Sequence, residues 1–495
     1  MSIFHALLFN VNTKISNGRN AGIHRIATHL RDQNWDVEAI DFTCFWTLEQ
    51  LKLLCSMRIT DNTKFIGFSH PFSNWNDELD RFTFWIKKTY PDILIISGSS
   101  NPPLFKSTSI DYFVAGYGEK ALDCLLNYKF SNGAPPKYTT IPDGRKIIYA
   151  IHDYPAYPHK SPTIFYEERD FIHENEFVPI EISRGCRFSC AFCNFPILGV
   201  KGDYTRDADN FEKQLIHAYD NWGVTNYMTN DETFNDYTEK ITKFADAVER
   251  LPFRPWFTGY IRGDLLATRK QDQEELLRMN YCGHFYGIET FNKTAGRHVG
   301  KGMDPDKLKE GLIDCKNYFT KYGFYRACIS IIFGLPYEPL DSMRETGKWL
   351  LENWKDQSAQ LHPLDIYKDD LVKDSKISAD YEKYGYRKLG VLSEKTNNML
   401  DLLNTNEVLI YAGNHIIWEN DFTNYHEVTE LALNLTEHFR LLDNFSLSHL
   451  TVDSKGKVYN FEEKKKLTID DTYPMFEYNQ IFIDNYISKK LNYKG

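Results

Sequence analysis

Three cysteines lie close together in the segment Arg184-Gly-Cys-Arg-Phe-Ser-Cys-Ala-Phe-Cys-Asn194, namely Cys186, Cys190 and Cys193. Thiolates are soft ligands that select zinc, copper(I) or iron–sulfur clusters. A structural zinc ion normally takes four protein ligands, and no second Cys-x-x-Cys or paired histidine motif follows to complete such a site. Three thiolates instead leave one iron of a 4Fe-4S cubane without a protein ligand. The spacing therefore favours an open cluster, with a zinc site completed by an unidentified fourth ligand as the alternative.

A barrel-like alternation of strands and helices must position this cysteine segment. Six strand-like runs are each followed by a helix-length stretch, and they span residues 178–183, 225–230, 255–260, 283–288, 325–333 and 360–367. Six strand–helix steps predict a partial parallel barrel over residues 178–375, in which chemistry belongs at the carboxyl ends of the strands. The cysteines follow the first of these strands, so they are expected at the mouth of the barrel.

The first 145 residues show a separate alternation, with strand-like runs at 5–11, 37–42, 64–69, 92–97 and 111–115. This pattern predicts an α/β domain with a Rossmann-like parallel sheet. Gly98 and Gly116 fall at strand ends, where ligands of such sheets bind, although tight turns alone would also explain them. Residues 146–177 are expected to be a linker, with a hairpin signal just before it at 142–144. Residues 376–495 are expected to form a small α+β or mainly helical cap, with a helix at 427–442 and a hairpin at 453–456.

Bulk composition narrows the classes of function. The 495 residues suggest about three domains. A net charge of −10 disfavours nucleic acid as a partner and leaves a small-molecule or peptide substrate favoured. The mean hydropathy of −0.48 and the absence of a long apolar run argue against membrane spans. Nine cysteines without a secretory signal are typical of reduced thiols in the cytoplasm.

The spacing C-x3-C-x2-C, with the aromatic Phe192 before the last cysteine, resembles the signature of the radical S-adenosylmethionine (SAM) superfamily. The resemblance implies that SAM chelates the open iron through its methionyl amine and carboxylate and is reductively cleaved there. The segment Tyr286-Gly-Ile-Glu-Thr290, followed by Lys301-Gly302, resembles one class of that superfamily, whose barrel follows a cobalamin-binding-type domain.

The resemblance also implies roles for residues at later strand ends. Glu289 would contact the SAM ribose or methionyl part, and Gly334, Leu335 and Pro336 would border the adenine. Asn230, Asp231 or Glu232 would take the place of a motif that binds the methionyl amine, and Arg262 would stand in the position of a family arginine. Each residue also has a structural explanation, such as a solvated strand end, a turn or a favourable charge at a helix N-terminus.

The N-terminal segments Tyr90–Gly98 and Asp111–Glu119 resemble the first domain of the same class, but two departures matter. No Asp-x-His-x-x-Gly motif follows the first strand, so the known histidine route to cobalt is absent. The usual Gly-Gly after the central strand reads Ser97-Gly98. Since other members of the class lack this histidine and bind cobalamin, and still others keep the fold without it, the sequence leaves cobalamin open.

The function that these residues predict is reductive cleavage of SAM to a 5'-deoxyadenosyl radical that modifies an unactivated carbon. A reducing partner such as flavodoxin or ferredoxin would be required. With cobalamin bound, the expected reaction is methyl transfer to carbon. Without cobalamin, the expected reaction is a rearrangement or an oxidation. The alternatives are a methylthiotransferase-like enzyme, for which Cys44, Cys55 and Cys124 would have to meet, a radical SAM-like fold that has lost activity, and a zinc-binding scaffold protein.

Overall fold

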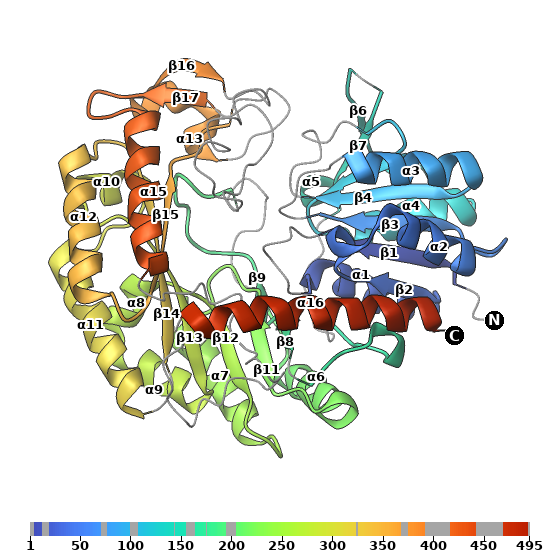
Figure 1. Cartoon of the computed structure of the whole chain (residues 1–495), viewed down its shortest axis with the longest axis horizontal. Helices are drawn as coiled ribbons and strands as arrows, with labels where there is room; N and C mark the ends of the chain where they lie inside the picture. Colours follow the sequence, from blue (N-terminus) through green and yellow to red (C-terminus); the bar gives the residue numbers. More distant parts are fainter. Residues whose placement is uncertain are drawn as a thin grey trace.

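The structure is a computed structural model that describes residues 4–11, 19–70, 77–99, 107–142, 144–154, 164–174, 176–194, 204–322, 325–367, 375–391, 416–441 and 469–493. Two predominantly parallel sheets lie side by side, each with its own helices (Figure 1). We call the first sheet and its helices the first unit, and the second sheet and its helices the barrel unit. The predicted α/β fold class is confirmed.

The first sheet has the strand order β2-β1-β3-β4-β5-β7-β6. Its strands are parallel except for β6, which pairs antiparallel with β7 close to the predicted hairpin. The strands are β1 (Ala6–Asn10), β2 (Val37–Ile40), β3 (Phe65–Ser69), β4 (Leu94–Ser99), β5 (Tyr112–Ala115), β6 (Thr139–Thr140) and β7 (Lys146–Tyr149). An order that begins 2-1-3-4-5 is that of a flavodoxin-like doubly wound sheet. Strand β7 carries this sheet past residue 145, into the segment expected to be a linker.

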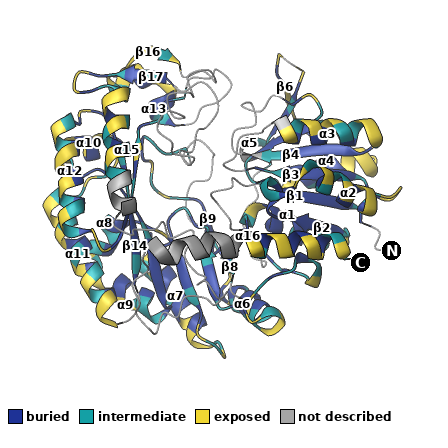
Figure 2. Ribbon diagram, viewed as in Figure 1, coloured by how far each residue is buried: buried dark blue, intermediate teal, exposed yellow. Residues whose placement is uncertain are grey.

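Helices cover both faces of the first sheet, so its central strands are buried (Figure 2). Helices α1 (Ala21–Arg31) and α4 (Glu119–Phe130) pack on one face, whereas α2 (Leu48–Arg58) and α3 (Asp77–Thr89) pack on the other. Shorter helical turns are η1 (Thr43–Phe45), α5 (Ala150–Asp153) and η3 (Glu168–Asp170).

The C-terminal part of the last helix, α16 (Ile469–Asn492), packs into the core of the first unit, and in Figure 1 this end of the helix lies near β2. Its apolar residues Ile483, Tyr486 and Ile487 join the cluster beneath α2 and α3. This differs from the expected division, which places all of residues 376–495 in one cap. The difference has a simple cause: an amphipathic helix must bury its apolar face, but its own sequence does not say against which surface.

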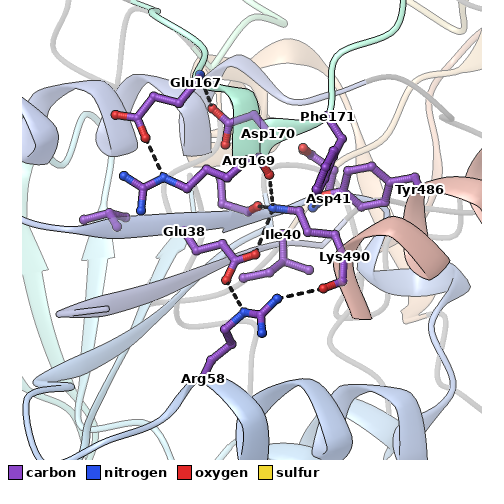
Figure 3. A network of polar contacts seen from close by, with 12 residues as sticks. Glu38, Ile40, Asp41, Arg58, Glu167, Arg169, Asp170, Phe171, Tyr486 and Lys490 are labelled. Carbon is purple, nitrogen blue, oxygen red and sulfur yellow. Dashed lines mark hydrogen bonds and ion pairs between the residues drawn. The ribbon is translucent and has the colours of Figure 1, made fainter. Parts of the chain in front are cut away.

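A buried polar network fastens α16 to strand β2 (Figure 3). Lys490 is fully buried and donates to Oε1 of Glu38 at 3.1 Å and to the carbonyls of Ala39 and Arg169 at 2.7 Å each. Arg58 completes the network, since it donates to Oε2 of Glu38 at 2.9 Å and to the carbonyl of Lys490 at 2.7 Å. The buried ammonium therefore has three acceptors, which offset the cost of removing it from water.

The barrel unit is built on six parallel strands in the order β15-β14-β13-β12-β11-β8. They are β8 (Phe177–Ile180), β11 (Asn226–Thr229), β12 (Trp256–Ile261), β13 (Tyr281–Glu289), β14 (Arg326–Phe333) and β15 (Ser358–Pro363). The helices between them are α6 (Ala208–Trp222), α7 (Thr238–Glu249), α8 (Gly263–Thr268), α9 (Lys270–Arg278), α10 (Lys293–Val299), α11 (Pro305–Tyr322) and α12 (Leu340–Asn353). All six predicted barrel strands are thus present, in sequential order.

The segments after the barrel are smaller. They are α13 (Lys376–Ala379), η4 (Tyr381–Tyr384), the antiparallel pair β16 (Arg387–Val391) and β17 (Ile416–Glu419), and α15 (Tyr425–Leu441). The predicted helix at 427–442 is therefore confirmed in α15, whereas the predicted hairpin at 453–456 lies outside the described residues. No helix in the described part of the chain is long and apolar enough to span a membrane.

Candidate active site

The cysteines lie on a loop, residues 185–194, that we call the cysteine loop. A two-residue strand, β9 (Ser183–Arg184), precedes it and pairs antiparallel with β10 (Tyr204–Thr205). The loop backbone is tied at two further points: the N–H of Ala191 donates to the carbonyl of Val299 at 3.1 Å, and the N–H of Ile377 donates to the carbonyl of Ala191 at 3.1 Å. These bonds connect the loop to the end of α10 and to α13. Elements later in the chain therefore hold the loop in place, in addition to strand β8 before it.

The three thiols have different surroundings. Cys190 is buried, whereas Cys186 and Cys193 are partly exposed. The Sγ of Cys186 lies 3.4 Å from Oγ1 of Thr233, just after β11. Among the described residues, no three His, Cys, Asp or Glu side chains converge as the ligands of a single metal ion would. Three thiolates on one partly exposed loop suit a cubane cluster, because each of them binds a different iron.

Arg262, at the end of β12, lies against the cysteine loop. Its guanidinium is 3.8 Å from the ring centroid of Phe188, and Nη1 donates to Sγ of Cys190 at 3.7 Å. Asp264 fixes the other edge of the guanidinium through bonds of 2.8 and 2.9 Å. Burial works to lower the pKa of Arg262, but Asp264 raises it above the ordinary value, so the group remains a cation beside Cys190.

The three candidates after β11 turn out to have different roles in the structure. Asp231 is fully buried and accepts from the hydroxyl of Ser183 at 2.5 Å, which stabilises the start of the cysteine loop. Burial raises the pKa of Asp231 to about 7, although nearby Lys240 opposes the rise. Glu232 accepts from the N–H of Gly185 at 3.0 Å, directly before Cys186. The side chain of Asn230 donates to the nearby carbonyl of Met228 at 3.4 Å, and its backbone N–H donates to the carbonyl of Ile180 in β8 at 2.9 Å.

Glu289 ends β13 in an unusual backbone conformation. Its φ is +70°, in the left-handed region that side chains other than glycine avoid, and the pairing of β13 with β14 shifts register at this point. The carboxylate folds back over Gly287 and lies 3.4 Å from Nζ of Lys301. Burial raises the pKa of Glu289, and Lys301 counteracts that rise. Such a strained, buried carboxylate at a strand end is typical of a functional position.

Gly334 follows β14 with a φ of +85°. A Cβ atom at this position would lie 2.4 Å from the ring of Trp418, and the hydroxyl of Tyr386 donates to the Gly334 carbonyl at 2.6 Å. Leu335 is completely buried. The segment Gly334 to Pro336 is therefore held by side chains from after the barrel, and the close approach of Trp418 requires glycine.

The carboxyl edge of the first sheet holds the two remaining glycine candidates. Gly98 pairs with Ser69 of β3, and Gly116 follows β5 with a φ of +95°. Two histidines near this edge are buried: His24 bonds to Asp41 at 3.0 Å, and His70 contacts the hydroxyl of Ser97. Burial lowers the pKa of His70 to about 3, so the ring is neutral at ordinary pH.

The geometry thus brings Glu232, Arg262 and Phe192 together at the cysteine loop. Glu232 bonds to the loop backbone, Arg262 bonds to a cysteine, and Phe192 packs against the barrel core. Glu289 and Gly334 lie on the two neighbouring strands, while Gly98 and Gly116 belong to the first unit. Sequence reasoning gave no separate role to Thr233 or Trp418. Thr233 lies in the segment from Thr229 to Thr233, which the sequence does single out. No local pattern indicates a role for Trp418, which lies far along the chain from Gly334.

Residues 180–350 match the family model of the radical SAM superfamily, so this part of the chain is a radical SAM domain. The match covers residues 180–350 of the 495 in the chain, and it leaves the reaction subtype open. No curated protein sequence matches the chain.

Solved structures extend the likeness beyond the barrel. The radical SAM methyltransferase TsrM from Kitasatospora setae, with tryptophan substrate and the SAM analogue aza-SAM bound, has a TM-score of 0.64 and 12% identity over 98% of this chain and 97% of its own. The cobalamin-dependent radical SAM enzyme OxsB, with aqua-cobalamin bound, has a TM-score of 0.62 and 15% identity over 99% of this chain and 72% of its own. At these identities the likeness is one of fold, and it includes both units.

Proposed function

We propose that Cys186, Cys190 and Cys193 hold a 4Fe-4S cluster and that SAM binds beside it at the carboxyl ends of β11 to β14. The observation that carries this proposal is the placement of the cysteine loop. It lies between Thr233 after β11 and Arg262 at the end of β12, and each of these side chains contacts a cysteine sulfur. When bound, the cluster supplies the electron that cleaves the sulfonium of SAM.

Residues at the strand ends would position SAM beside the cluster. Glu232 keeps lone pairs for the methionyl ammonium, because a carboxylate has about four acceptor positions and its two described partners use two. Glu289 would contact the ribose hydroxyls or the methionyl part, and the buried turn from Gly334 to Pro336 would border the adenine. Arg262 holds a positive charge beside Cys190, which stabilises the thiolate form of that ligand.

We propose further that the substrate is a small molecule and that cobalamin binds at the carboxyl edge of the first sheet, near Gly98 and Gly116. The support is the likeness in fold to TsrM and OxsB over both units. When bound, cobalamin would supply the methyl group for transfer to carbon.

Product analysis tests the SAM proposal. The full chain is reconstituted anaerobically with iron and sulfide and incubated with SAM, with and without dithionite, and the SAM-derived products are separated by chromatography. We expect dithionite-dependent consumption of SAM that Cys190→Ala abolishes. The matched control is Cys282→Ala, at a cysteine buried within β13, which should retain the activity. Equal consumption by the Cys190 variant would contradict the proposal.

A separate experiment tests cobalamin. The protein is incubated anaerobically with hydroxocobalamin and desalted, and its visible spectrum is recorded. A retained corrinoid spectrum at about one equivalent is the expected result. A colourless protein would remove methyl transfer by cobalamin from the proposal and leave rearrangement or oxidation by the radical as the reaction.

A further inference from the structure

The loop after β5 of the first unit reaches across to the barrel unit. Tyr117, between Gly116 and Gly118, donates its hydroxyl to Oε1 of Glu232 at 2.6 Å. The other oxygen of Glu232 accepts from the N–H of Gly185 at 3.0 Å. One carboxylate is thus held by the first unit on one side and by the cysteine loop on the other.

Tyr117 is itself held firmly. The guanidinium of Arg184 lies 4.1 Å from the centroid of the Tyr117 ring, an arrangement in which the cation and the ring attract each other. Arg184 in turn bonds to Glu119 of α4 at 2.6 Å and to Glu181 just after β8. The ring therefore lies on a buried ionic network that joins the two units, so its hydroxyl has little freedom to point elsewhere.

The two bonds fix the direction of the Glu232 carboxylate without using up its capacity as an acceptor. A phenol that donates to an ionised carboxylate makes a charge-assisted bond, which is shorter and stronger than a neutral one. Burial raises the pKa of Glu232, whereas the bond from Tyr117 lowers it, so the tyrosine favours the ionised form. An ionised, oriented carboxylate is what an ammonium group requires.

We propose that Tyr117 is a positioning residue for SAM: it orients Glu232 of the barrel unit toward the methionyl ammonium from the neighbouring unit. The inference rests on the proposed function, because it takes Glu232 as the partner of that ammonium. It adds that the SAM site is incomplete without the first unit, since the hydroxyl that aims the carboxylate comes from there.

A double-mutant cycle in the reconstituted full chain tests this inference. The variants are Tyr117→Phe, Glu232→Gln and the double variant, and the dissociation constant of SAM is measured from its effect on the electron paramagnetic resonance (EPR) spectrum of the reduced cluster. Tyr117→Phe should weaken SAM binding about tenfold, equivalent to about 1.4 kcal/mol. The double variant should bind SAM no more weakly than Glu232→Gln alone, because the hydroxyl acts only through that carboxylate.

Two readouts separate positioning from loss of structure. Iron content and the EPR spectrum without SAM should be unchanged in Tyr117→Phe, while the KM for SAM rises and kcat stays within about twofold. The matched control is Tyr128→Phe, an exposed tyrosine of α4 in the same unit, which should bind SAM as the wild type does.

The remaining outcomes overturn the inference in distinguishable ways. Wild-type affinity in Tyr117→Phe, or additive losses in the double variant, would refute the positioning role and leave the cluster and SAM proposal intact. Wild-type affinity in Glu232→Gln would refute Glu232 as the partner of the ammonium, and the role of Tyr117 with it. A wild-type cluster whose spectrum SAM does not change would refute the proposed function itself.

Discussion

Glu338 offers a sharp test of the energetics at the mouth of the barrel. It follows β14 by five residues and is 1% exposed. Thr290 donates to its Oε1 at 2.6 Å, and Oε2 has no hydrogen-bond partner within the part of the chain that the structure describes. Burial raises the pKa of Glu338 from 4.5 to about 8, and the bond from Thr290 only partly offsets this rise. The folded protein therefore holds Glu338 as a neutral acid at neutral pH.

The sign of the resulting pH dependence follows from linkage. Because the folded state binds the proton more tightly than the unfolded state, the stability from this group is complete below pH 4.5 and is lost as the pH rises through about 8. A pKa of about 8 in place of 4.5 corresponds to about 5 kcal/mol, since one pKa unit is worth about 1.4 kcal/mol. We therefore expect the free energy of unfolding of the Glu338→Gln variant, relative to that of the wild type, to rise by up to about 5 kcal/mol as the pH rises across this range.

The assay is the Tm of the apoprotein from pH 5 to pH 9, followed by circular dichroism. One kcal/mol shifts the Tm of a unit of this size by about 2 to 4 °C, so the Tm of Glu338→Gln minus that of the wild type should rise by about 10 °C between the two ends. Glu345→Gln, at an exposed carboxylate of α12, is the control and should show a difference that does not vary with pH. A constant difference for Glu338→Gln would refute the reasoning.

Two further substitutions test the packing. Gly334→Ala should lower the Tm by about 5 to 10 °C, because its Cβ would collide with Trp418 at a φ of +85°, while Gly302→Ala, which meets nothing within 4 Å, should leave the Tm unchanged. A normal Tm for Gly334→Ala would contradict the contact with Trp418. Lys490→Met should lower the free energy of unfolding by about 3 to 5 kcal/mol, because three buried acceptors lose their donor. The matched change at exposed Lys489, Lys489→Met, should lower it by less than about 0.5 kcal/mol. Equal Tm values for the two lysine variants would refute the docking of α16 on β2.

Much of the fold was predictable because its signals are local. The apolar run from Asp92 to Ser97 and the six barrel strands repeat at the spacing of strand and helix, and parallel order follows from that alternation. The placement of α16 was not predictable, since no local pattern indicates that Lys490 would meet Glu38, more than four hundred residues earlier in the chain.

The candidate site divides in the same way. The cysteine spacing and the motifs around Glu289 and Gly334 depend on neighbouring residues, so sequence could single them out. Sequence could not separate Asp231 from Glu232, because only the folded chain shows that Asp231 bonds to Ser183 while Glu232 bonds to Gly185. The bond from Tyr117 to Glu232 joins two units, and one sequence carries no record of such a contact.

The central claim is that the three cysteines hold a 4Fe-4S cluster with an iron open to SAM. The most direct test is the EPR spectrum of the anaerobically reconstituted and reduced full chain, recorded with and without SAM, alongside metal analysis. We expect about four irons per chain, the content of one cubane, and a spectrum that SAM alters. About one zinc per chain, or an iron signal that SAM leaves unchanged, would contradict it.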